Sequence, residues 1–220
     1  MGFNIADWKA YVAETGVLQT NKYDVIITLD NPQGMGGLNI NGSDGTTMST
    51  KDSTADITYR CISASIPGLT MRTADVARYG VGVVEKMPYS AGYTDVNLTF
   101  LMDRYGTQYN FWYAWFNYIF GVSGEETLSN IYGTYKVGQG RSFYTAEYKD
   151  NYSATVTITV YDNEGNPSIV ATLLKAYPLS VNDVALSWTD DNNLVKVSVN
   201  LTFREWVMGD GQYNVSVSRN

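Results

Sequence analysis

The sequence predicts a mainly β protein: an antiparallel β-sandwich or flattened barrel, with one packed α-helix and a short N-terminal helix. Three segments, 95–102, 153–161 and 194–204, alternate apolar and polar residues, which is the side-chain period of a half-buried strand. Residues 107–120 break this alternation and are long enough for a helix that ends at Gly121. Because the connections between alternating segments are short, we expect antiparallel strands, with the helix covering one open side of the sandwich.

The N-terminal part is expected to contain a helix, a strand and a long loop. Residues 5–15 have an amphipathic pattern, with Asn4 as a candidate N-cap and Gly16 as a candidate C′ residue. The strand over 23–29 places four residues on one face: Tyr23, Val25, Ile27 and Leu29. Residues 30–56 are rich in Gly, Asn, Ser and Thr and show almost no apolar pattern, which predicts a long loop insertion.

Three extended segments are expected to follow this loop. Residues 56–64 predict a strand, which stops at the turn pair Pro67-Gly68. Its expected inward-facing residues are Ile57, Tyr59 and Cys61. Residues 69–77 and 81–88 then predict two further extended segments.

The C-terminal half begins with a second expected insertion. This insertion spans about 121–152: residues 121–140 are polar and Gly-rich, and 141–149 is a candidate strand. Four strands are then expected, over residues 153–161, 168–175, 183–188 and 194–204. The first two should form a hairpin, because the intervening DNEGNP at 162–167 is a cluster of turn residues. No internal repeat or linker divides the sequence, and we therefore expect residues 1–220 to form one domain.

Composition and charge argue against an enzyme. The 220-residue chain has no histidine, which removes the commonest general base and the commonest metal ligand. The adjacent carboxylates Asp190-Asp191 and Glu125-Glu126 do not aim at one point, as a glycosidase pair must. We therefore expect no catalytic residue, no cofactor and no metal site. The net charge of −7 disfavours a DNA-binding module, and the lack of a long apolar segment predicts no membrane insertion.

The segment over 107–120 is unusual because aromatic side chains cover nearly all sides of the expected helix. A helix that is apolar nearly all round is buried nearly all round. One interpretation is a deep core helix. The other is burial by neighbouring subunits, which the high Tyr and Trp content favours. The candidate subunit-interface residues are Tyr109, Trp112, Tyr113, Trp115 and Phe116.

Four stretches carry a more specific pattern: YDVIITL (23–29), CISASIPGL (61–69), ARYGVGVVEKMPYSAGYTDVNLTFLMD (77–103) and LLKAYPLSVNDVALSWTDDNNLVKVSVNLTFREW (173–206). The last is the most specific, with a strand, an aromatic-proline pair, a short run to LSW, an acidic turn and a long alternating strand that stops at an aromatic residue. Together with the two expected helices, these stretches give a sequence that resembles the tail tube proteins of contractile-tailed bacteriophages.

The resemblance implies a tail-tube-like fold and a structural virion protein, a subunit of hexameric rings that stack into a tube. In such a tube the strands of all subunits form one barrel, whose lumen conducts DNA during ejection without binding it specifically. The candidate lumen-facing residues, chosen by pattern, are Thr155, Thr157, Thr159, Lys196, Ser198 and Asn200. The implied partners are further copies of the chain, the tail sheath and the baseplate, and the implied location is the phage tail after assembly in the host cytoplasm. A lumen that shared the net negative charge of the chain would repel DNA.

Two alternatives stay open at this point. A baseplate protein that initiates the tube would have the same fold and the same strands. A carbohydrate-binding β-sandwich would also use many Tyr and Trp residues. It predicts aromatic side chains spaced along an exposed face, however, whereas a cluster of them here lies within 107–120.

Overall fold

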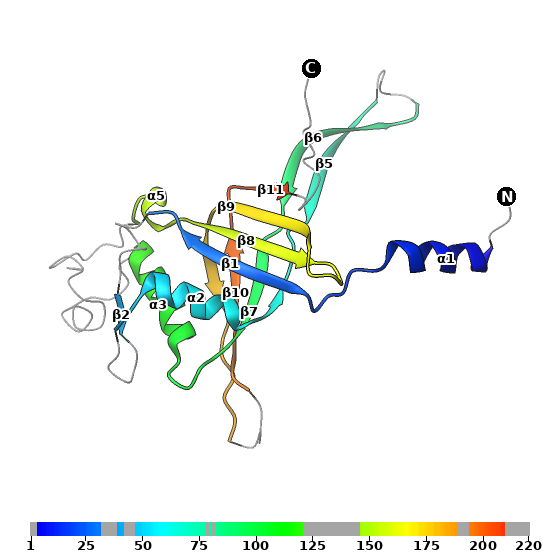
Figure 1. The fold of residues 1–220 in the computed structure, drawn as a ribbon. Coiled ribbons are helices and arrows are strands. Elements are labelled where there is room, and N and C mark those ends of the chain that lie inside the picture. The colour runs from blue at the N-terminus through cyan, green and yellow to red at the C-terminus, as the bar shows by residue number, and fades with distance from the viewer. Residues whose placement is uncertain are drawn as a thin grey trace.

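A computed structural model describes residues 4–31, 39–41, 47–77, 80, 82–120, 146–188 and 194–209 (Figure 1). The described helices are α1 (Ile5–Thr15), α2 (Thr50–Tyr59), α3 (Thr107–Phe120) and α5 (Lys149–Tyr152). The described strands are β1 (Tyr23–Leu29), β2 (Asn39–Asn41), β3 (Thr47–Ser49), β4 (Cys61–Ala64), β5 (Leu69–Val76), β6 (Glu85–Tyr93), β7 (Val96–Leu101), β8 (Ala154–Tyr161), β9 (Pro167–Val181), β10 (Lys196–Thr202) and β11 (Glu205–Gly209). The predicted mainly β class is confirmed.

Seven of these strands form one antiparallel sheet in the order β1-β8-β9-β10-β7-β4, with β11 paired to β9. Strand β9 is long, with 15 residues, and it takes part in two regions of the sheet. Residues 167–176 lie beside β8 and β11, whereas residues 177–181 lie beside β10. We call the two regions the β8 half-sheet (β1, β8, residues 167–176 of β9, and β11) and the β10 half-sheet (residues 177–181 of β9, β10, β7 and β4).

The chain passes from one half-sheet to the other near Lys175, which has a φ of 55°. A positive φ is uncommon for a residue with a side chain, and here it marks a bend in the strand. Ion pairs of the Lys175 ammonium with Asp30 at 3.4 Å and Asp150 at 3.1 Å lie at this bend. Beyond it the strands run in a different direction, as Figure 1 shows for β8 and β10. The architecture is therefore a sandwich folded from one bent sheet, not a closed barrel.

The apolar faces of both half-sheets turn into one core. Val156 and Ile158 of β8 are buried, as are Val197 and Val199 of β10, while the residues between them are mostly less buried. The other strands contribute Val25, Ile27, Val96, Leu98, Phe100, Ala171, Leu173 and Leu201. The faces predicted from alternation in β7 and β10 are thus confirmed. In β8 the predicted face holds from Ala154 to Ile158 and fails beyond it, where Thr159 is buried and Val160 is half-buried. Helix α3, whose predicted bounds are also confirmed, packs on this core.

The predicted strand over 56–64 is wrong in its first half. Helix α2 runs to Tyr59, and only β4 is a strand. Ile57 is buried as expected, but Tyr59 is 89% exposed, because residues two apart do not share a face of a helix. Asp56 and Arg60, four residues apart, form an ion pair along the helix at 3.0 Å.

The expected loop insertion over 30–56 also needs correction. Within it the structure places the small β2–β3 hairpin and most of α2. The segment has few apolar residues, so its sequence shows no apolar pattern from which these elements could be predicted. Helix α2 is held largely by the tertiary contacts of a few residues such as Ile57. The described parts of this segment that form β2, β3 and α2 therefore belong to the fold.

Of the second insertion, 121–152, residues 121–145 lie outside the described residues, as does most of the candidate strand over 141–149. Residues 149–152 form the short helix α5.

The strand expected over 183–188 is absent: these residues have no strand partner in the described chain. Strand β9 instead runs past the predicted end at residue 175 to Val181, and pairs with β10. Because β10 already has β9 on one side and β7 on the other, it offers no free edge to residues 183–188.

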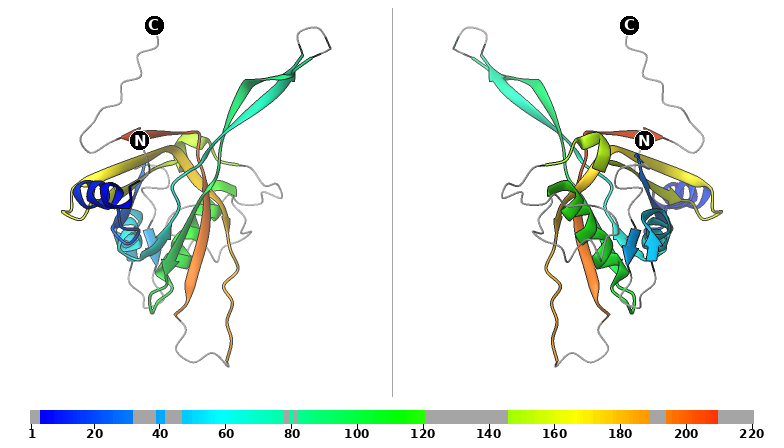
Figure 2. Two further views of the ribbon diagram at one scale, coloured as in Figure 1. Left: turned by 90° about the vertical axis from the view of Figure 1, so that its right-hand side faces the viewer. Right: turned by 90° about the vertical axis from the view of Figure 1, so that its left-hand side faces the viewer.

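Two elements extend away from the sandwich. The β5–β6 hairpin projects from its upper end in the views of Figure 2. Helix α1 lies to one side, joined through residues 16–22 (Figure 1). Its predicted caps are confirmed, since the Asn4 side chain accepts a hydrogen bond from the Ala6 N–H at 3.0 Å and Gly16 has a φ of 73°.

Candidate functional site

The outward face of the β10 half-sheet carries a row of polar side chains that bond to one another. Asn97 of β7 donates from Nδ2 to Oδ1 of Asn200 on β10 at 2.7 Å, and Asn200 donates from Nδ2 to Oγ of Ser180 on β9 at 2.9 Å. At the other end, Ser65 Oγ accepts from the backbone N–H of Asn97 at 2.9 Å. The row follows from strand pairing, because Asn200 lies directly opposite both Asn97 and Ser180.

A second row lies beside the first. Thr99 Oγ1 and Ser198 Oγ are hydrogen bonded at 2.9 Å, and Ser63 of β4 lies opposite Thr99. Of the candidate lumen-facing residues, Ser198 and Asn200 thus belong to these rows, and Lys196 lies exposed at the first position of β10. We call the set of seven residues the polar face: Ser63, Ser65, Asn97, Thr99, Ser180, Ser198 and Asn200.

The other candidate lumen-facing residues lie on the β8 half-sheet. Thr155 donates from Oγ1 to the Asp30 carboxylate at 2.8 Å, Thr157 is half-buried, and Thr159 is buried. Because each half-sheet turns its apolar face into the common core, their polar faces point away from it on different sides. The structure therefore does not bring these threonines together with the polar face.

The candidate subunit-interface residues on α3 separate into two groups. Trp112 and Trp115 have no exposed surface, and their rings stack with centroids 5.6 Å apart. Phe116 is half-buried, whereas Tyr109 and Tyr113 are 43% and 45% exposed. A side chain without exposed surface cannot contact another subunit. The two tyrosines are therefore the members of this set that are most open to a neighbour.

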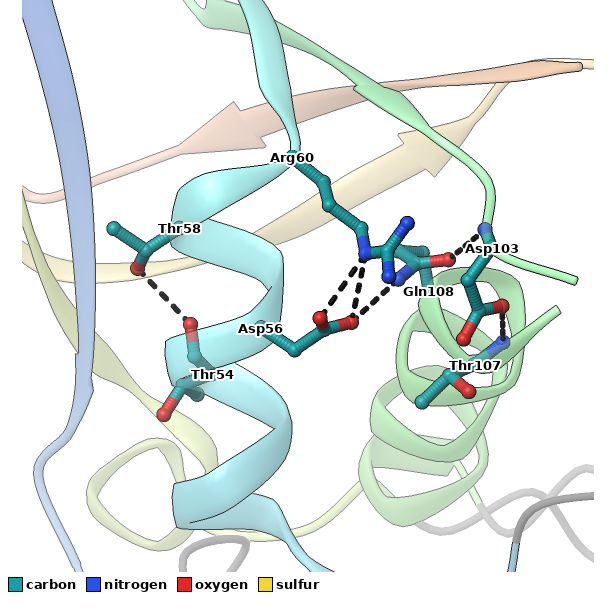
Figure 3. A network of polar contacts seen from close by, with 7 residues as sticks. All are labelled: Thr54, Asp56, Thr58, Arg60, Asp103, Thr107 and Gln108. Carbon is teal, nitrogen blue, oxygen red and sulfur yellow. Dashed lines mark hydrogen bonds and ion pairs between the residues drawn. The ribbon is translucent and has the colours of Figure 1, made fainter. Parts of the chain in front are cut away.

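A partly buried polar network joins α2 to the start of α3 (Figure 3). The Asp56 carboxylate accepts from Arg60 Nε at 3.0 Å and from Gln108 Nε2 at 2.7 Å. The fully buried Gln108 also accepts from the Asp103 N–H at 2.7 Å, and the Asp103 carboxylate accepts from the Thr107 N–H at 2.7 Å. The sequence analysis missed this network. Its local signals are the four-residue spacing of Asp56 and Arg60 and the presence of Asp103 shortly before the first residue of α3.

The β5–β6 hairpin exposes large apolar side chains. Its strands pair only with each other among the described strands, and Met71 and Tyr89 are 66% and 67% exposed. Further exposed apolar residues on or beside it are Leu69, Val76, Val83, Val84, Met87 and Tyr93. Grouped apolar exposure of this kind marks an interaction surface. The sequence analysis predicted extended structure here without assigning it a role.

The described residues offer little for catalysis. No group of three or more His, Cys, Asp or Glu among them could hold a metal ion. Burial raises the pKa of the Cys61 thiol to about 11, so the thiol stays protonated near neutral pH. No helix in the described part of the chain is long and apolar enough to cross a membrane.

Comparison with known proteins gives one family match. The family model described as phage tail tube protein matches residues 18–209. None of the curated proteins compared with the chain matches it.

Among solved structures, the chain is similar to a chain of the PVC extracellular contractile injection system in its extended sheath–tube complex. That likeness has 13% identity, covers 95% of this chain and 99% of that chain, and has a TM-score of 0.48. A chain of the anti-feeding prophage tube-terminating cap is 12% identical over 89% and 92% of the two chains, with a TM-score of 0.49. Hcp1 from Salmonella typhimurium is 10% identical over 85% and 92%, with a TM-score of 0.36. Likenesses this weak carry no functional information.

Proposed function

The chain belongs to the phage tail tube protein family, and we propose that it is the tube subunit of a contractile phage tail. The observation that supports this most is the extent of the family match. Residues 18–209 include every strand of both half-sheets, the β5–β6 hairpin and α3, so that α1 is the one described element left out. In this proposal the protein is structural, a component of the virion tail with no catalytic role.

The proposed assembly is a stack of hexameric rings around a channel that conducts DNA during ejection. We assign the wall of the channel to the polar face of the β10 half-sheet. This face of the half-sheet is polar, and on the opposite face Val197, Val199 and Leu201 are buried in the core. The wall of a water-filled channel needs one polar face and one apolar face of this kind. Thr155, Thr157 and Thr159 form the competing candidate wall.

Contacts between subunits are assigned to surfaces that the single chain leaves open. The β5–β6 hairpin would reach a neighbouring subunit, where Met71 and Tyr89 could become buried. Tyr109 and Tyr113 on α3 add exposed aromatic surface, and tyrosine is enriched in protein interfaces. The sheath and the baseplate would contact the outside and one end of the tube, and assembly would take place in the host cytoplasm.

Negative-stain electron microscopy of the purified protein tests the proposal. We expect rings and tubes with sixfold symmetry. Single rings that do not stack would instead favour a baseplate protein that initiates the tube. Monomers at all concentrations, together with glycan binding, would contradict the proposal and favour a carbohydrate-binding sandwich.

A further inference from the structure

The β10 half-sheet continues beyond the sandwich at both of its ends. At one end, beside the pair formed by Val96 and Leu201, strands β4 and β7 lead into the β5–β6 hairpin. At the other end β10 begins at Lys196, and the β9–β10 loop (residues 182–195) connects it to β9. Figure 2 shows the hairpin leaving the upper end and the described part of the loop leaving the lower end. The two extensions therefore point in opposite directions along the strands.

The β9–β10 loop exposes large apolar side chains. About 2–5 residues are enough to connect two antiparallel neighbours such as β9 and β10, and a much longer connection is usually functional. Among the described residues of the loop, Trp188 is fully exposed, and Leu186 and Leu194 are 79% and 70% exposed. Tryptophan is also enriched in protein interfaces. The loop is thus a second exposed apolar surface, at the opposite end of the half-sheet from the hairpin.

The two surfaces differ in net charge. The loop contains three acidic residues, Asp183, Asp190 and Asp191, and no basic residue. Lys196 follows it directly, so that the loop and this lysine together carry −3 + 1 = −2. The hairpin and its connection, residues 69–93, contain three basic and two acidic residues and carry 3 − 2 = +1. Opposite net charges favour contact of the loop with the hairpin, whereas two copies of the loop would repel each other.

We propose that the β9–β10 loop of one subunit docks on the β5–β6 hairpin of a subunit in the next ring. This rests on the proposed function, and it names the surface that receives the hairpin. Subunits of one ring lie at the same height, so the opposite ends of the β10 half-sheet meet between rings and not within one. A contact between two different surfaces repeats without limit along an axis, which gives an open-ended tube. A contact of loop with loop would pair two rings and stop there.

The variant Trp188→Ser tests whether the loop carries the contact between rings. Because Trp188 is fully exposed in the single chain, we expect an unchanged melting temperature and rings of normal size. Stacking into tubes, measured by sedimentation and electron microscopy, should fall at least tenfold. Tyr148→Ser removes another exposed aromatic side chain, beside α5, and should form tubes as wild type does. Normal tubes from the Trp188→Ser variant would overturn the inference and leave the loop to a different partner, such as the sheath.

Cross-linking tests whether the hairpin is the partner of the loop. Ala185→Cys in the loop and Glu85→Cys in the hairpin, distinguished by different tags, are assembled together into tubes and treated with a flexible bismaleimide. The wild-type protein measures the background from Cys61, whose raised pKa makes it slow to react. We expect links between the two variants at least tenfold above the links formed in tubes of either variant alone. Equal linking in tubes of a single variant, or none in mixed tubes, would overturn the assignment of the hairpin as partner.

The wild-type protein separates this inference from the function on which it rests. If wild-type chains form no tubes under any condition, the proposed function is overturned first. If they form tubes, and Trp188→Ser or the cross-links give the contrary result, the docking of loop on hairpin is wrong and the tube subunit stands.

Discussion

Helix α3 and the β5–β6 hairpin are both rich in large apolar side chains, but they use them in opposite ways. Trp112 and Trp115 of α3 are fully buried within the chain, whereas Met71 and Tyr89 of the hairpin are 66% and 67% exposed. The difference shows that apolar content alone does not identify an interface. To identify an interface, the apolar content of a segment has to be considered together with the number of helices and strands that surround that segment.

The cause lies in how each element is supported. Helix α3 packs where both half-sheets turn their apolar sides inward, so that Trp112 meets Phe100 of β7 with ring centroids 5.5 Å apart. The hairpin has only two strands, and a two-stranded hairpin has no sheet neighbour or helix against which to bury a face. Changes in α3 should therefore affect stability first, and changes in the hairpin should affect assembly first.

The largest effect is expected for a charge placed on the core side of a strand. Val199→Asp puts an unpaired carboxylate where Val199 is fully buried, and we expect no soluble folded protein. Asn200→Asp is the matched control one residue along. It keeps an acceptor for Asn97 and loses the donor to Ser180, for a cost of about 0.5–1.5 kcal/mol. Soluble yield and circular dichroism check the pair, and equal tolerance would mean that the register of β10 is different.

The next largest effect is expected for Trp115→Ala. Removing this fully buried ring leaves a cavity and frees the Tyr152 carbonyl that its Nε1 bonds at 2.8 Å. Truncation of a buried aromatic costs about 3–5 kcal/mol of unfolding free energy. Tyr113→Ala, on the exposed side of the same helix, should change the unfolding free energy by no more than about 0.5 kcal/mol. Denaturant titration measures both, and similar losses would contradict the division of α3 into a core side and an open side.

A smaller effect is expected for Gln108→Leu. This change leaves the Asp56 carboxylate without its bond to Gln108 and the Asp103 N–H without an acceptor. An unpaired buried group costs about 1–3 kcal/mol, so the melting temperature should fall measurably. Tyr59→Ala, at an exposed position of α2, is the control and should have little effect. Unchanged stability of the Gln108→Leu variant would show that α2 does not depend on this network.

The smallest effect on stability is expected in the hairpin. The double change Met71→Ser and Tyr89→Ser removes exposed apolar surface, so we expect a shift of no more than about 0.5 kcal/mol in unfolding free energy. Tube formation, followed by electron microscopy and light scattering, should nevertheless be lost. Glu85→Gln, also on an exposed part of β6, should assemble as wild type. Normal assembly of the double variant would remove the hairpin from the subunit interface.

Residues close together in the sequence were enough to predict several features. Alternation in β7, in β10 and in the first part of β8 identified which side of each strand is buried, because a strand reverses its side chains at every residue. The bounds of α3 and the caps of α1 were also predictable, since the break in period and the cap residues are local signals. The polar side of β10 was therefore recognisable as a candidate surface from its alternation alone.

Other features depend on partners far away in the chain, and only the tertiary structure decided them. Helix α2 replaces the predicted strand over residues 56–59 because Ile57 finds a place in the core and Asp56 finds Gln108, which is 52 residues away. Strand β9 continues beyond its predicted end because its bend at Lys175 brings it beside β10. Likewise, Ser198 and Asn200 became part of a bonded face only when pairing placed β7 and β9 on either side of them. Periodicity is a property of neighbouring residues, whereas strand partners and burial are set by the fold as a whole.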